Sequence, residues 1–99
     1  MRIADLAGRR VAVWGYGREG KAALAALRMR LPTLRPTLFC NEAEARAISD
    51  LDCVTTPPTA ADLAAFDVVI KSPGISVYKP EILEAQHNGT RFTSGTALW

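Results

Sequence analysis

The sequence has little of what several classes of protein depend on. Its 99 residues include two cysteines, Cys40 and Cys53, and one histidine, His87. This composition excludes a disulfide framework and predicts no metal site, so we expect both cysteines as small apolar residues in strands. No apolar run approaches the roughly 18 residues of a membrane-spanning helix, and the N-terminus lacks the apolar core of a signal peptide. We therefore expect a cytoplasmic protein that has no membrane partner.

Charge of one sign is also scarce. Twelve Lys and Arg against ten Asp and Glu give a formal net charge of +2. That surplus is too small to indicate a nucleic-acid partner. A chain of 99 residues has no room for a second hydrophobic core. We therefore expect a single domain over residues 1–99.

Short apolar runs alternate with helix-forming segments along the chain. The pattern predicts strands at 10–15, 37–40, 53–58, 67–74 and 90–95, and helices at 18–31, 41–48, 59–66 and 79–89. Strands that alternate with helices imply a parallel sheet with right-handed crossovers. We predict a Rossmann-like, doubly wound α/β fold: a mostly parallel five-stranded sheet with helices on both faces, its fourth strand beside its first.

One glycine-rich loop carries the main functional signal. The segment VAVWGYGREGKAALAALR, residues 11–28, contains G-x-G-x-x-G at Gly15, Gly17 and Gly20. It follows a buried strand and opens a helix, which is the context that dinucleotide binding requires. The first glycine permits the turn, the second lets a diphosphate approach the backbone, and the third lets the helix pack on the strand. The alternative is that the glycines serve only a tight turn.

Two other nucleotide patterns fit less well. Gly15 to Lys21 also reads as the start of a P-loop, but Ala22 stands where a Ser or Thr must hold magnesium. An NAD site wants an acidic residue about 20 positions after the last glycine, where this chain has Cys40. Glu42 keeps open an NAD-binding domain of a dehydrogenase or transport regulator. Asn41 is either a helix cap or a ligand contact.

A second motif, KSPGIS at residues 71–76, follows the fourth strand. Ligands of doubly wound sheets bind at the switch point between the loops after strands one and four. We therefore expect the Gly15 loop and the Ser72–Pro73–Gly74 turn to face each other across one site, although a plain strand exit is the alternative. No nucleophile–base pair or paired carboxylates are apparent, so we assign no catalytic residue. A nucleotide-free interaction module is a further alternative.

The glycine loop, the SPGIS motif some fifty residues later and the closing TSGTALW together resemble the N-terminal domain of the Mur ligase family. The resemblance covers essentially the whole chain. It is strongest for the members that add glutamate to UDP-N-acetylmuramoyl-L-alanine in peptidoglycan synthesis, and leans toward the branch that adds L-glutamate. The choice between D- and L-glutamate belongs to a C-terminal domain that this chain lacks.

The resemblance implies a domain that binds the UDP part of this precursor and has no cofactor of its own. ATP and Mg²⁺ belong to a central domain, and the incoming amino acid to a C-terminal domain. Both lie outside this chain, which we expect to be one part of a longer cytoplasmic enzyme. By motif, the UDP-binding residues are Gly15, Tyr16, Gly17, Arg18, Glu19 and Gly20 around the diphosphate, Asn41 and Glu42 near uridine, and Ser72, Pro73, Gly74 and Ile75 opposite.

One position departs from the family pattern. Many relatives have an Asp that bonds to uracil where this chain has Cys40. The uracil contact then passes to Asn41 or Glu42, or is lost.

Overall fold

The computed structural model describes residues 3–48, 51–72 and 78–94. Its elements, in chain order, are the 3₁₀ helix η1 (Ile3–Leu6), β1 (Val11–Trp14), α1 (Arg18–Arg30), β2 (Thr37–Phe39), α2 (Glu42–Arg46), β3 (Asp52–Val54), α3 (Ala60–Ala64), β4 (Val68–Lys71), α4 (Pro80–His87) and β5 (Arg91–Thr93).

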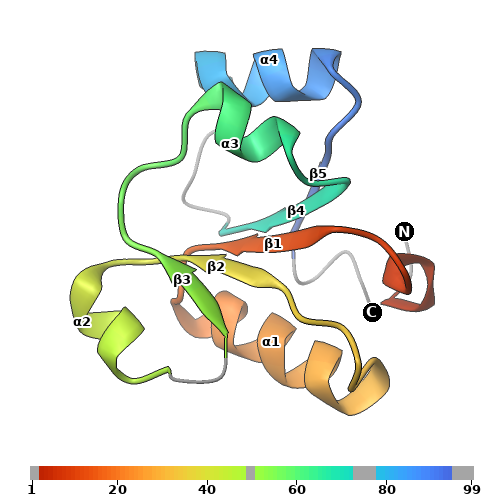
Figure 1. Ribbon diagram of the computed structural model, residues 1–99, viewed down its shortest axis with the longest axis vertical. Helices are drawn as coiled ribbons and strands as arrows, with labels where there is room; N and C mark the ends of the chain where they lie inside the picture. The colour runs from red at the N-terminus through yellow and green to blue at the C-terminus, as the bar shows by residue number, and fades with distance from the viewer. Residues whose placement is uncertain (1–2, 49–50, 73–77, 95–99) are drawn as a thin grey trace.

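The strands form one sheet in the order β3-β2-β1-β4-β5, and every neighbouring pair is parallel. α1 and α2 lie on one side of the sheet, and α3 and α4 lie on the other (Figure 1). The prediction of a Rossmann-like α/β fold is confirmed, including the placement of the fourth strand beside the first.

The centre of the sheet is the β1–β4 pair. Their register runs from Val11 opposite Val68 to Trp14 opposite Lys71. The first three residues of each strand are buried. An apolar run without polar alternation is typical of strands that are covered on both faces. β1 and β4 are both covered in this way.

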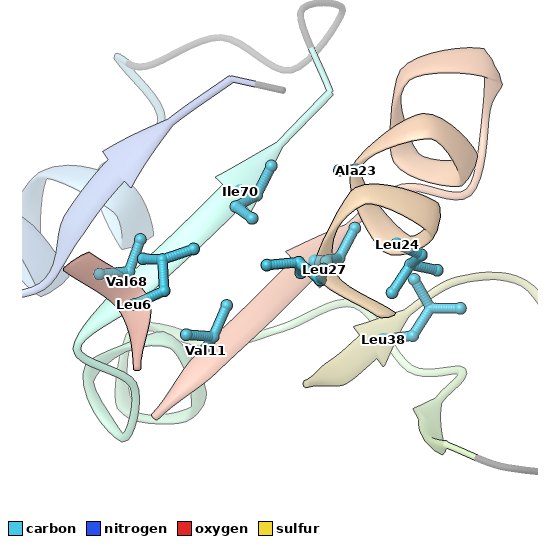
Figure 2. Packing of buried hydrophobic residues seen from close by; sticks show 9 residues of the cluster. Leu6, Val11, Ala23, Leu24, Leu27, Leu38, Val68 and Ile70 are labelled. Atoms are coloured by element: carbon cyan, nitrogen blue, oxygen red, sulfur yellow. The ribbon is translucent and has the colours of Figure 1, made fainter. Parts of the chain in front are cut away.

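The larger core lies between the sheet and α1 (Figure 2). Ala23, Leu24 and Leu27 of α1 are buried there because their spacing puts them on one face of the helix. Leu6 of η1 joins the same cluster and is fully buried, with 0% of its surface exposed. The sequence interpretation missed η1, since its four residues are too few to show a helical period.

The second core lies under α3 and α4. It gathers Ala12, Phe39, Leu63, Val69, Ile82 and Ala85. The one buried polar side chain recorded among the described residues, Thr90, belongs to this region. Its hydroxyl donates to the Phe66 carbonyl at 2.9 Å and approaches the Leu63 carbonyl at 3.3 Å. Thr90 directly precedes β5, so these bonds link the start of β5 to the end of α3.

Element ends differ from the predictions by a few residues. β3 begins one residue earlier than predicted and stops at Val54, short of the two prolines that follow. α1 ends at Arg30, and Leu31 caps it with a bond from its amide to the Leu27 carbonyl. Prediction from pattern locates an element better than its ends, because terminal residues depend on caps and on neighbouring chain.

Candidate functional site

The turn after β1 brings two distant segments into contact. Gly15 has φ +97°, a left-handed conformation that favours glycine. A Cβ placed on Gly15 would lie 3.1 Å from the Cβ of Ser72, and the Ser72 amide donates to the Trp14 carbonyl at 2.9 Å. The first glycine turn and the end of β4 therefore meet, as the switch-point argument predicts. The rest of the predicted turn lies outside the described residues: Pro73, Gly74 and Ile75.

The other two glycines of the motif differ in their surroundings. Gly20 is buried, and a Cβ there would collide with the carbonyl oxygen of Gly15 and lie 3.8 Å from a methyl of Val13. Close packing of α1 against the end of β1 thus requires glycine at this position, as predicted. Gly17 has no heavy atom within 4 Å of a built Cβ, and its φ of −81° is open to any residue. Gly17 therefore borders open space.

The N-terminus of α1 has the electrostatics of an anion site. Gly17 is its N-cap, and no side chain caps the helix there. The first amides of a helix have no partner within the helix, and the helix dipole adds partial positive charge. Arg18 is exposed beside them. The Lys21 ammonium lies 5.2 Å from the centroid of the Tyr16 ring, so it adds positive charge within one turn.

Glu19 is half-buried at the start of α1. Its Oε2 is buried and has no hydrogen-bond partner in the part of the chain that the structure describes. A carboxylate in the first turn of a helix is favoured by the helix dipole. Because a carboxylate repels phosphate, the group that Glu19 can offer an anionic ligand is its backbone amide.

A groove opens where β1, β2 and β3 end. Its volume is about 440 Å³. Its wall consists of Trp14, Gly15, Phe39, Cys40, Asn41, Glu44, Thr55, Thr56, Pro57, Pro58 and Lys79. A hollow of similar volume, about 420 Å³, lies at the amino ends of the strands, near Arg9 and Arg35. Volume alone does not identify the site; the glycine turn and the carboxyl ends of the strands favour the first groove.

Asn41 caps α2 with both halves of a capping box. Its Oδ1 accepts from the Glu44 amide at 2.7 Å, and its own amide donates to Glu44 Oε1 at 3.1 Å. The predicted N-cap role of Asn41 is confirmed. A ligand contact by Asn41 stays a prediction, and its Nδ2, which takes no part in the box, is the group that could make it. Glu42 is exposed in the first turn of α2. Glu44, which sequence analysis did not single out, lines the groove.

The two cysteines are free and half-buried. Cys53 lies in β3, and Cys40 follows directly after β2. Partial burial, together with the neighbouring Cys53 thiol and the Glu44 carboxylate, raises the pKa of Cys40 to about 11. Cys40 therefore presents a neutral thiol to the groove near pH 7, and not an activated nucleophile.

One wall of the groove was not predicted from the sequence. Thr55 and Thr56 come straight after β3, and Lys79 precedes α4. The two threonines fell inside the strand predicted at 53–58; because β3 ends at Val54, they stand just past its carboxyl end. Lys79 offered no sequence signal, since its place depends on how α4 returns over the sheet.

Two further findings concern metals and membranes. Within residues 3–48, 51–72 and 78–94, no three His, Cys, Asp or Glu side chains come together as a set that could hold a metal ion. In the same ranges, every helix falls short of the length and apolar character of a membrane span.

Comparison with known proteins gives a consistent set of relatives, although no family model matches the chain. The chain is 53% identical over 103 residues to the UDP-N-acetylmuramoyl-L-alanine–L-glutamate ligase of Xanthomonas euvesicatoria. Identity to the ligases of the same name is 48% over 103 residues in Xylella fastidiosa and 38% over 115 residues in Salinispora tropica. Each match covers 100% of this chain and 22–23% of the relative. The chain thus spans about a fifth of the length of these relatives.

Proposed function

Since this chain belongs to the Mur ligase family, we propose that it is the N-terminal domain of such a ligase and binds the UDP moiety of UDP-N-acetylmuramoyl-L-alanine. The whole protein is then an ATP-dependent ligase that joins L-glutamate to this precursor in cytoplasmic peptidoglycan synthesis. The three relatives named above carry L-glutamate in their names, which favours that stereoisomer.

The observation that carries the proposal is the uncapped start of α1 beside the Gly15–Ser72 contact. Helix amides that no side chain satisfies are suited to a diphosphate, because they donate hydrogen bonds in the same direction as the helix dipole. Open space at Gly17 lets the ligand approach the backbone. In this arrangement the amides from Tyr16 to Gly20 hold the diphosphate.

The uridine is proposed to lie in the groove next to the end of β2. Asn41 can donate from Nδ2 while its Oδ1 caps α2. Glu42 stands one position further, at the exposed start of that helix. Cys40 offers only a weak S–H donor to a base, so Asn41 is the stronger candidate for uracil recognition. Pro73, Gly74 and Ile75 stay predictions for the opposite side.

The chemistry itself is proposed to belong to the rest of the enzyme. A central domain supplies ATP and Mg²⁺, which activate the precursor's carboxylate as an acyl phosphate, and a C-terminal domain presents the amino group of glutamate. This chain then contributes affinity and orientation. Holding the carboxylate in place lowers the entropy that the transition state must lose.

A ¹⁵N NMR titration of the chain with UDP-N-acetylmuramoyl-L-alanine tests the proposal. Shifts confined to the amides of residues 16–20 and to those near Asn41 and Ser72 are expected, with NAD⁺ and ATP as parallel controls. Equal or larger shifts with NAD⁺ contradict the proposal and favour a dehydrogenase-type domain.

A Glu42→Gln variant separates the same two functions. An NAD site requires the carboxylate at the end of the second strand to bind the ribose hydroxyls. Loss of NAD⁺ binding in this variant would therefore favour an NAD-binding domain. In our proposal Glu42 adds at most one peripheral contact, and UDP-precursor affinity is expected to fall by less than about tenfold, the equivalent of one hydrogen bond.

A further inference from the structure

The two cysteines lie on neighbouring strands and on the same face of the sheet. Cys53 pairs with Leu38 in the β2–β3 register. Cys40 comes two residues after Leu38, and its amide continues the ladder by donating to the Val54 carbonyl at 3.0 Å. Side chains alternate along a strand, so Cys40, Leu38 and Cys53 share one face. Both cysteines also pack against the same core cluster.

The diagonal arrangement suits some bridges better than others. Adjacent strands are about 4.8 Å apart and rise about 3.3 Å per residue, which puts the two Cα atoms about 8 Å apart. A disulfide needs a Cα separation below about 7 Å unless the backbone moves. A metal ion that binds both sulfurs at about 2.3 Å each can span about 4.6 Å between them. The pair is therefore placed to bind an ion between the thiols more readily than to form a disulfide.

We propose that Cys40 and Cys53 together bind one soft metal ion of the Cu⁺ class at the edge of the groove. Both thiols are free, and thiolate sulfur is the ligand that selects Cu⁺ over harder ions. Two thiols and one Cu⁺ give an S–Cu–S unit, and two protons pass to solvent. The unit carries one net negative charge where two neutral thiols stood before.

Metal binding at this pair acts on the neighbouring groove. Cys40 and Glu44 both line it, so the S–Cu–S unit places its net negative charge close to the Glu44 carboxylate. An anionic nucleotide in the same groove is repelled by both charges. This coupling rests on the function proposed above, whereas binding of the ion does not.

The ion site is tested by anaerobic titration of the chain with Cu⁺ against bicinchoninate as a competing chelator. We compare the wild-type chain with Cys40→Ser and Cys53→Ser, which are nearly the same size. One ion per wild-type chain is expected, and each serine variant should lose at least about 100-fold in affinity, because the second thiolate acts at a high effective concentration. The proposal is wrong if either variant, shown to be folded by circular dichroism, keeps wild-type affinity, or if the wild-type chain binds two independent ions.

The coupling is tested by repeating the NMR titration with one equivalent of Cu⁺ present. UDP-precursor affinity is expected to fall several-fold in the wild-type chain and to stay unchanged in Cys53→Ser. Unchanged wild-type affinity overturns the coupling. Absence of nucleotide binding without Cu⁺ overturns the proposed function, while the metal site stands or falls on the serine variants.

Discussion

The turns before α1 and before α2 both follow the carboxyl ends of neighbouring strands. They differ in whether a side chain caps the first amides of the helix. At α2, Asn41 and Glu44 form a complete capping box. At α1, the N-cap is Gly17 and no side chain satisfies the amides. The contrast shows that the start of α1 leaves its amide donors available to an anion, whereas the start of α2 does not. Position at the carboxyl edge is not sufficient.

The largest effect is expected from Gly20→Ala, which attacks the packing beneath the α1 turn. The new Cβ meets the Gly15 carbonyl oxygen, a backbone atom that cannot rotate away. We expect a loss of about 3 kcal/mol or more in the free energy of unfolding, at the upper end for overpacking, measured by urea denaturation. Gly17→Ala is the matched control: its Cβ has open space, so stability should change by less than about 1 kcal/mol while nucleotide binding weakens.

Gly15→Ala is expected to rank second. A left-handed conformation costs a residue with a Cβ about 1–2 kcal/mol, and contact with Ser72 at 3.1 Å adds to it. Gly89→Ala has a similar φ of +102° and no heavy atom within 4 Å of its Cβ. Both variants should be destabilised in urea, but only Gly15→Ala should lower UDP-precursor affinity. Equal affinity losses would show that the α1 turn has no special place in binding.

Removal of a capping box should have a smaller effect. Asn41→Ala frees the α2 amides and is expected to cost about 1 kcal/mol of stability. Thr59→Ala breaks the equivalent box at α3, where Thr59 Oγ1 accepts from the Asp62 amide at 3.2 Å, and should cost about the same. Only the Asn41 variant should also weaken binding of the UDP ligand in the NMR titration. A ligand affinity that falls equally in both variants contradicts a direct role for Asn41.

The smallest effect on stability is expected from a change at Asp67, at the amino ends of the strands. Hydrogen bonds from the Arg10 amide and guanidinium lower the pKa of Asp67. A carboxyl whose pKa is lowered on folding stabilises the fold above its unfolded pKa, and that stability is lost as pH falls through the folded value. Asp67→Asn should therefore reduce the stability difference between pH 7 and pH 3 slightly, as followed by thermal unfolding. It should leave nucleotide binding unchanged, because Asp67 lies away from the groove wall.

The sequence predicted the fold well for a definite physical reason. Short apolar runs rich in β-branched residues, such as that of β4, favour a buried strand. Asn41 and Thr59 mark helix starts through local hydrogen bonds that need no tertiary context. The contact between Gly15 and Ser72 followed from topology alone. By contrast, η1 and Lys79 could not be predicted, because the first is too short to show a period and the second lies at the groove only through the packing of α4.

The order of strands also governs when the domain can assemble. β1 pairs with β2 on one side and β4 on the other. The ion pair that precedes the β1–β4 pair, Arg10 with Asp67, joins residues 57 positions apart. Closing so long a loop costs entropy before any contact repays it. During synthesis, β1, β2 and β3 can meet as soon as residue 54 has emerged. The side of β1 that faces β4 stays unpaired until β4 has emerged. During this interval the nascent chain is most exposed to pairing with a wrong strand.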